Sequence, residues 1–160
     1  MKKIAFIGVM VAVVAASAAL TAGAAEIAFT GGAGGTGTDL AAAANWDGGA
    51  LPSAAGVTGV VDVATFGGSY TVSTDASLDG LMFANASANI SINGSGTLSL
   101  GAGGFTVDGT CGITLRAPMA VTASSTWSMG NGTVNSYAAI SGTADFALND
   151  WADQIGRAHV

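Results

Sequence analysis

Short apolar pairs recur about every eight residues along the chain from Tyr70 to Leu148. In each pair residues i and i+2 are hydrophobic, and most of the residues between them are small or hydroxylic. A period of two places the hydrophobic members on one face of an extended backbone, which is the pattern of a β-strand. Gly, Asn, Asp and Ser separate the pairs and permit the positive φ of tight turns. The pattern predicts a ladder of strands with inward pairs Tyr70/Val72, Leu81/Phe83, Ile90/Ile92, Leu98/Leu100, Phe105/Val107, Ile113/Leu115, Met119/Val121, Trp127/Met129, Ala138/Ile140 and Phe146/Leu148.

Two all-β architectures accommodate such a ladder. The chain is rich in Ala and has 25 Gly among its 160 residues, so its strands have to pack against one another rather than against helices. We predict a right-handed parallel β-helix, a solenoid in which three short strands make each coil of roughly 22 to 24 residues. The alternative is an antiparallel β-sandwich. Strand direction distinguishes the two.

Two further elements are expected before the ladder. Residues Val60 to Phe66 read as another strand, with Val61, Val63 and Phe66 facing inward. Asp39 is placed to cap one or two helical turns that extend to Ala44, the sole helical candidate. Most of the protein is therefore expected to be strand and turn.

The first residues have the features of a secretory signal peptide. A basic start at Lys2 and Lys3 precedes an apolar run from Ile4 to about Leu20, and small residues follow through Ala25. The alternative is a membrane anchor, but seventeen residues that include many Ala are a marginal length for crossing about 30 Å of hydrocarbon. We expect export with cleavage after Ala24 or Ala25.

The last residues, Ile155 to Val160, resemble the translation of a short-read sequencing adapter. We therefore expect residues 154–160 to be a non-native tail and the biological sequence to continue beyond Asp153 in a longer protein. The expected organisation is a signal peptide at 1–25, a Gly/Ala-rich entry segment and N-terminal cap at 26–58, and truncated solenoid repeats at 59–153.

Charge excludes one class of partner. Of the four basic residues, Lys2 and Lys3 lie in the leader and Arg157 in the tail, which leaves Arg116 against ten acidic residues. Nucleic-acid binding needs clustered Lys and Arg that displace counterions from phosphates. The sequence therefore predicts no nucleic-acid partner.

Acidic residues provide the only candidates for a metal site. Asp75 and Asp79 lie four residues apart, and Asp145, Asp150 and Asp153 cluster near the end. Carboxylates of this kind bind Ca²⁺. No Asp-x-Asp-x-Asp spacing accompanies them, and aspartates in turns commonly accept hydrogen bonds from their own backbone. We predict no metal and no cofactor.

Catalytic chemistry finds equally little support. Arg116 follows Leu115 at an outward position and is expected to be a solvated strand residue rather than a base. Cys111 is the only cysteine and is expected to be a small buried hydrophobe. The Ser and Thr hydroxyls have no His partner once His159 is assigned to the tail. We predict no catalytic residue and no enzymatic activity for this segment.

The three tryptophans are candidates for stacking on sugar rings if they are exposed. In so thin a solenoid a Trp more often fills the core or covers its end. We expect Trp127 to lie in the core and Trp46 to cap the end, and Trp151 stays a candidate without an assignment.

Several weak motifs occur in a specific order, and together they resemble autotransporter-associated beta-strand repeat proteins. The resemblance covers about Asn45 to Leu148. The motifs are Asn45-Trp46, Leu51-Pro52, Asp62-x-Ala64-x-Phe66, Leu81-x-Phe83, Leu98-x-Leu100-x-x-Gly103-Gly104-Phe105, Ile113, Ala117-Pro118, Trp127 and Ile140-Ser141-Gly142.

This resemblance implies the N-terminal part of a β-helical passenger, exported by a bacterium and then secreted or held at the cell surface. The implied role is structural or adhesive. The implied partners are glycans or the surface of host or neighbouring cells, with the outer membrane reached only through a C-terminal region absent from this sequence. The alternative function is the N-terminal part of a carbohydrate-active β-helix enzyme, a polysaccharide lyase or a glycosidase.

Overall fold

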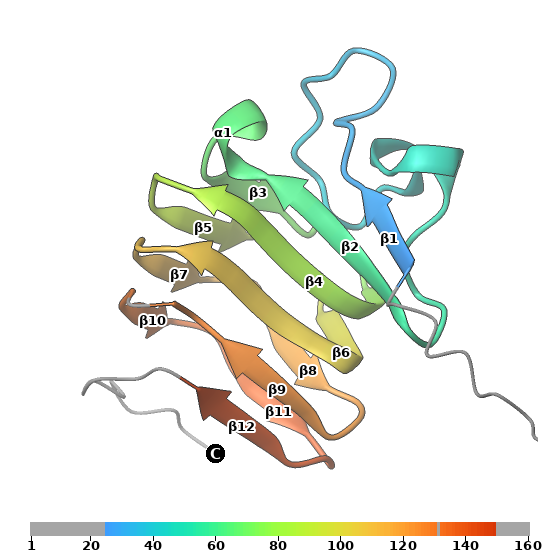
Figure 1. Ribbon diagram of the computed structural model, residues 1–160. Helices are drawn as coiled ribbons and strands as arrows, with labels where there is room; N and C mark the ends of the chain where they lie inside the picture. Colours follow the sequence, from blue (N-terminus) through green and yellow to red (C-terminus); the bar gives the residue numbers. More distant parts are fainter. Residues whose placement is uncertain (1–24, 131, 150–160) are drawn as a thin grey trace, which may run out of the picture.

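The computed structural model describes residues 25–130 and 132–149, which form a parallel β-helix of about four coils (Figure 1). The ten pairings between its strands are all parallel. The predicted solenoid is therefore confirmed, and the antiparallel sandwich is excluded. Residues 1–24 of the predicted signal peptide and the predicted 154–160 tail lie outside the described residues.

The strands form two sheets. Strands β1, β2, β4, β6, β8, β9, β11 and β12 belong to the larger sheet, and β3, β5, β7 and β10 form the smaller one. The bounds are β1 Ala25–Ala28, β2 Val57–Asp62, β3 Ser69–Thr71, β4 Ala76–Ala86, β5 Ile90–Asn93, β6 Leu98–Gly109, β7 Ile113–Leu115, β8 Met119–Val121, β9 Ser125–Ser128, β10 Val134–Ser136, β11 Ile140–Gly142 and β12 Phe146–Asn149.

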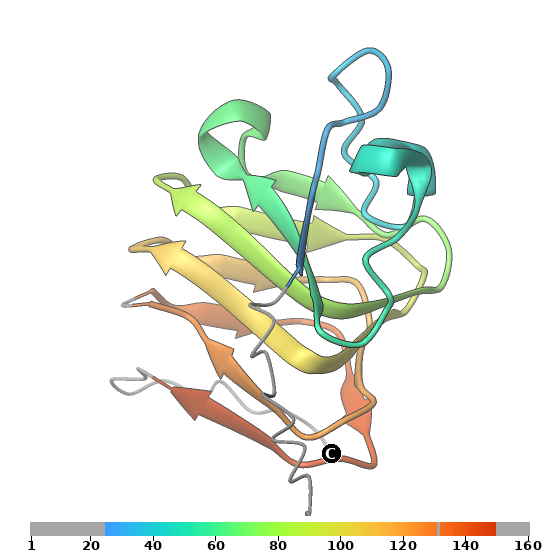
Figure 2. The same ribbon diagram turned by 45° about the vertical axis from the view of Figure 1, so that its right-hand side comes forward.

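Each coil has three faces, but the number of separate strands changes along the axis. In the coils nearer the N-terminus, here called the upper coils, β4 and β6 each run continuously around one corner, with a register shift between Leu78 and Gly80 (Figure 2). In the lower coils the same path is divided into β8 followed by β9, and β11 followed by β12. The prediction of three short strands per coil therefore fits the lower coils, whereas the upper ones merge two of the three.

The length of a coil follows from the register. Leu81 pairs with Phe105, and Tyr70 pairs with Ile92, so both steps fall within the predicted coil length. The last coil is shorter. Each of its three strands follows its partner strand by 21 residues, one fewer than the lower limit of the predicted range, as Ile140 does opposite Met119. The predicted length thus describes the steps from β2 to β4, β4 to β6, β3 to β5 and β5 to β7. The first step is longer, because Ala25 pairs with Val57, and the step from Leu98 to Met119 is as short as those of the last coil.

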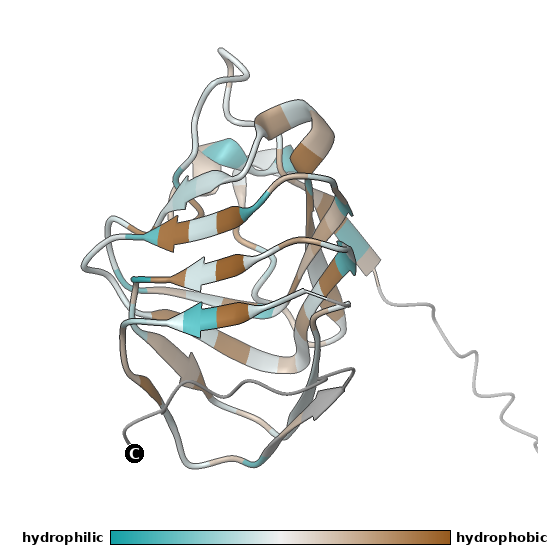
Figure 3. Ribbon diagram, turned by 90° about the vertical axis from the view of Figure 1, so that its left-hand side faces the viewer, coloured by the Kyte–Doolittle hydropathy of each residue, from teal (hydrophilic) through white to brown (hydrophobic). Residues whose placement is uncertain are grey.

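The interior is filled by the predicted pairs, stacked coil upon coil. In the view that faces the smaller sheet, β5 and β7 each show two hydrophobic positions separated by a more polar one (Figure 3). Burying one Leu or Ile stabilises the fold by about 1.5 to 3 kcal/mol. Ala138 and Ile140 are only half-buried, and the side chains of Phe146 and Leu148 lie outside the described part. The pairs that are buried as predicted are Tyr70/Val72, Leu81/Phe83, Ile90/Ile92, Leu98/Leu100, Phe105/Val107, Ile113/Leu115, Met119/Val121 and Trp127/Met129.

Aromatic rings form a column through this interior. The ring centroids of Tyr70 and Phe83 are 5.0 Å apart, those of Phe83 and Phe105 are 5.7 Å apart, and those of Phe105 and Trp127 are 5.5 Å apart. Each step connects successive layers of the helix. Trp127 is 1% exposed, which confirms its predicted place in the core.

The column ends at Trp46, near the N-terminal end of the solenoid. The Trp46 ring lies edge-on to Phe29, with centroids 5.0 Å apart, and its Nε1–H donates to the Leu40 carbonyl at 3.0 Å. Gly59 permits this packing, because a Cβ there would lie 2.7 Å from the Trp46 ring. Trp46 is itself 2% exposed.

The expected strand from Val60 to Phe66 is wrong at its C-terminal end. Strand β2 stops at Asp62, and Val63–Phe66 form the short helix α1. The Asp62 side chain accepts hydrogen bonds from the Ala64 amide and the Thr65 hydroxyl, so it caps this helical turn. Val61 and Val63 are buried as expected, and Phe66 is half-buried.

The helical turns expected between Asp39 and Ala44 are wrong in extent. Asp39 does cap a turn, since its carboxylate accepts from the Ala41 amide at 3.0 Å. The helical residues begin later, in the 3-10 segment η1, Ala43–Asn45, and a second such segment, η2, spans Asp47–Gly49. In the part of the chain that the structure describes, no helix is long and apolar enough to cross a membrane.

Candidate functional site

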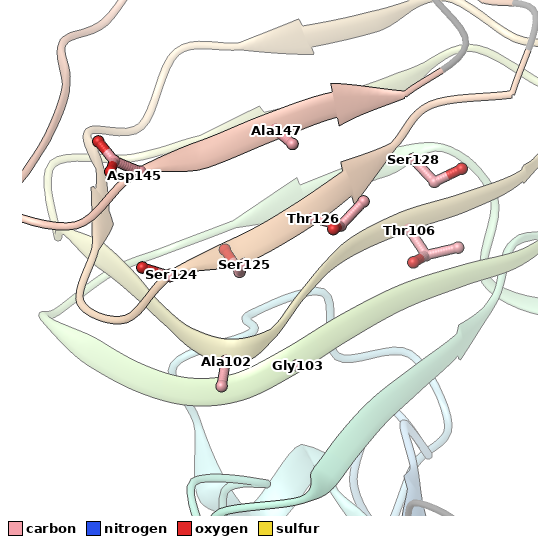
Figure 4. Close-up of a pocket in the computed structure, with 9 residues that line it drawn as sticks. All are labelled: Ala102, Gly103, Thr106, Ser124, Ser125, Thr126, Ser128, Asp145 and Ala147. Carbon is pink, nitrogen blue, oxygen red and sulfur yellow. The ribbon is translucent and has the colours of Figure 1, made fainter.

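A concavity lies on the outer surface of β6, β9 and β12 (Figure 4). It is a shallow, open trough of about 630 Å³. Its lining is composed of small and hydroxylic side chains with a single carboxylate, and aromatic and basic side chains do not contribute. The lining residues are Ala102, Gly103, Thr106, Ser124, Ser125, Thr126, Ser128, Asp145 and Ala147.

The trough exists because the outward positions of neighbouring coils are occupied by small residues. Thr106 lies opposite Ser128 in the register, and Thr126 lies opposite Ala147. Asp145 precedes β12 and is exposed at one end. Within the described residues the Ser125 hydroxyl is buried without a hydrogen-bond partner. The trough offers donors and acceptors for a polar ligand and has no candidate nucleophile paired with a base.

The two acids weighed as a Ca²⁺ pair, Asp75 and Asp79, accept hydrogen bonds from different backbone amides. Asp75 accepts a hydrogen bond from the Thr97 amide at 2.7 Å, whereas Asp79 accepts one from the Gly56 amide at 2.8 Å. Both carboxylates therefore join neighbouring coils through backbone amides. In the described part of the chain no three His, Cys, Asp or Glu side chains gather closely enough to hold a metal ion. Asp150 and Asp153 lie outside this part.

Asp62 shows how such an acid is held in its charged form. The Thr65 hydroxyl and the Asn85 amide donate to its carboxylate, and the Ala64 amide adds a third donor. These hydrogen bonds, that from Thr65 first, lower the pKa of Asp62 below its ordinary value and outweigh the opposing effect of desolvation. The carboxylate is thus a structural acceptor at the corner before Gly67.

A second surface lies on the smaller sheet, around Arg116. This residue follows β7 and is exposed, as predicted. Its Nη1 donates to the Ser91 hydroxyl at 3.2 Å in the coil above. Its guanidinium carbon lies 5.4 Å from the centre of the Tyr137 ring in the coil below. One arginine therefore spans three successive coils, and both of these contacts are with neutral groups.

Tyr137 was not among the candidate residues identified from the sequence. It is 73% exposed and is the exposed large hydrophobic residue of the described part. Its pairing with Arg116 rests on the length of the last coil, because the Tyr137 amide donates to the Leu115 carbonyl and so aligns the two residues. The available signal was an aromatic residue at an outward position, outside the predicted apolar pairs.

Cys111 and Tyr70 are the remaining perturbed groups. Cys111 is buried, as predicted, and burial raises the pKa of its thiol, which keeps it protonated and unreactive. Desolvation first, and then the charge of Asp62, raises the pKa of Tyr70 to about 12. Both groups are part of the packed interior. His159 and Trp151 lie outside the described residues.

Comparison of the chain with protein-family models, with curated proteins and with solved structures gives no match. The strand pairing defines the class of the protein as a parallel β-helix, with one polar surface at the trough of the larger sheet and another around Arg116 on the smaller sheet.

Proposed function

We propose that this chain is a structural or adhesive segment of an exported bacterial surface protein, in which the solenoid displays its outer faces for recognition. The resemblance to autotransporter-associated beta-strand repeats and the leader-like residues 1–25 support export. The observation that carries the display role is the division between a closed apolar interior and outer faces of hydroxyl and amide groups. Backbone pairing holds the coils together, so outward side chains are available for contacts.

No observation on the described residues favours the second candidate, the N-terminal part of a carbohydrate-active β-helix enzyme. A glycosidase needs two carboxylates flanking one bond at about 5 to 10 Å. In the described residues, the hydrogen bonds of Asp75 and Asp79 tie these two acids to different backbone amides.

Export is tested by fusing alkaline phosphatase, which is active only outside the bacterial cytoplasm, to the C-terminus of the full chain. We expect an active periplasmic fusion whose mature N-terminus is Ala25 or Glu26. The matched control replaces Lys2 and Lys3 by Glu, which removes the basic start of the leader and is expected to reduce export. An inactive fusion that retains residues 1–25 in the cytoplasm would contradict the proposal.

A further inference from the structure

We propose that the outer face of β5, β7 and β10 binds an acidic saccharide, with Arg116 holding a carboxylate and Tyr137 supporting a sugar ring. This inference rests on the proposed function, because it names the ligand class that a displayed face would recognise. It concerns the smaller sheet and is independent of the trough on the larger sheet.

Charge selects the sign of the ligand. The chain has a net charge of −6, so most of its surface repels anions. Arg116 is the one basic residue of the described part. Its contacts with Ser91 and Tyr137 leave its charge facing neutral groups, and a guanidinium has five N–H donors, of which Ser91 uses one. The remaining donors suit a carboxylate, which guanidinium binds through two parallel hydrogen bonds.

The arginine is held in place before any ligand arrives. Ser91 accepts from Arg116, and its own hydroxyl donates to the Asn93 side-chain carbonyl at 3.3 Å. The Asn93 amide donates in turn to the Tyr70 carbonyl at 3.4 Å. The Tyr137 ring packs against the guanidinium from the next coil. Preorganisation of this kind lowers the entropic cost of binding.

The surroundings favour a saccharide over an acidic peptide. The residues flanking Arg116 in the outward register, Ser91, Thr114 and Asn135, are hydroxylic or amide groups that match sugar hydroxyls. Arg116 lies against the Tyr137 ring, and with 73% of the residue exposed the rest of that ring is open for stacking. A protein partner would require a buried aromatic or aliphatic anchor in a pocket. The outward positions around Arg116 are polar instead.

The test uses the purified full chain and a hyaluronan tetrasaccharide, whose alternate sugars carry carboxylates. Binding is measured by titration calorimetry at low ionic strength, with the methyl-esterified tetrasaccharide as the uncharged counterpart. We expect the acidic form to bind at least about tenfold more tightly than the ester, the difference that one charge-assisted bidentate contact supplies. Equal affinity for the two forms, or binding of neither, would overturn the proposal.

Variants locate the site. We expect Arg116→Gln to weaken binding about tenfold, and Arg116→Lys to weaken it less, because Lys retains the charge but not the planar fork. Tyr137→Phe should bind as the parent does and Tyr137→Ala several-fold more weakly. The control is Ser53→Ala, an exposed loop position away from both surfaces, which should leave affinity unchanged. Unchanged affinity in Arg116→Gln, or loss in the control, refutes this location.

Two further readouts separate the possible outcomes. Competition by poly-glutamate as strong as that by the tetrasaccharide would show a general anion site and contradict saccharide selectivity. Melting temperatures of the Arg116 variants should lie close to that of the parent, because the arginine is exposed. The binding assay uses purified protein, so a failure to bind the saccharide would not contradict export. A failure of export would be seen in the phosphatase fusion and would not change the binding result.

Discussion

The first coils and the last described coil use the same paired strands, yet they differ in how their interiors are covered. At the N-terminal end Phe29, Leu40 and Trp46 are all buried. In the last coil Ile140 and Ala138 are half-buried, and Val134 is the most exposed member of the core. Parallel pairing alone therefore does not bury a coil. A layer of side chains has to lie on top of it.

Side-chain hydrogen bonds differ in the same direction. Near the N-terminal end the Asp39 carboxylate accepts from Ala41 and also from Ser73, which lies 34 residues away. In the last coil the Ser136 hydroxyl bonds locally to the Ala138 carbonyl, and the Ser141 hydroxyl reaches only the coil directly above it. Both ends thus have side-chain contacts to the neighbouring coil, but near the N-terminal end one carboxylate accepts hydrogen bonds from both its own turn and the next coil.

The largest effect is expected at Trp46. Truncation in Trp46→Ala removes a buried ring that contacts Phe29 and also breaks the bond to the Leu40 carbonyl. We expect the free energy of unfolding to fall by about 3 to 5 kcal/mol. Urea denaturation followed by circular dichroism measures this change.

A matched variant keeps the Trp46 experiment informative if Trp46→Ala does not fold. Trp46→Phe retains most of the apolar volume and should lose substantially less stability. A loss below about 1 kcal/mol in Trp46→Ala would break the comparison, because the ring would then not be needed to cover the upper coil.

The inward pairs were predictable because burial in a solenoid alternates with a period of two, which is a local property. Eight of the nine pairs whose side chains the structure describes are buried. The helical turn after Asp62 was missed, although the signal lay in the residues themselves, because Asp62 and Thr65 can satisfy the backbone locally and so end a strand. The merging of strands in β4 and β6 rests on register shifts between coils and has no local signature.

The candidate binding face shows the same limit. Arg116 was predicted to be exposed from its parity alone. Its partner was not predictable, because a last coil longer by a single residue would place Ala138 beside Arg116, whereas the observed register places Tyr137 there. Such a shift reverses which side chains point outward. Surface clusters in this fold are therefore set by corner lengths, which the predicted range of coil lengths does not resolve.

The next largest effect compares two residues at one register position. Met119 is fully buried in β8, and Ile140 lies opposite it in β11 and is half-buried. We expect Met119→Ala to cost about 2 to 5 kcal/mol, and Ile140→Ala about 1 kcal/mol or less. The measurement is again urea denaturation of the full chain. Equal losses would show that Ile140 is covered as well as Met119, which would remove the difference between the coils.

The smallest effect at neutral pH is expected at Tyr70, whose hydroxyl donates to the Gly67 carbonyl. Tyr70→Phe deletes this bond and should cost about 0.5 to 1.5 kcal/mol. The Tyr70→Phe variant is most informative at high pH. The pKa of Tyr70 is raised from 10.0 to about 12 in the folded protein, chiefly by desolvation. Between these values the unfolded chain has released the proton while the folded chain retains it, so stability falls as pH rises from about 10 to 12.

Tyr70→Phe should remove this part of the alkaline loss and leave a shallower decline. The chain has two tyrosines, so the experiment is done in a Tyr137→Phe background, in which the ultraviolet absorbance of phenolate reports Tyr70 alone. If Tyr70 titrates near 10 in the folded protein, its ring is more accessible to water than its complete burial implies. The upper coil would then be less well sealed around Tyr70 than its packing against the Phe29 ring indicates, with the two ring centroids 6.1 Å apart.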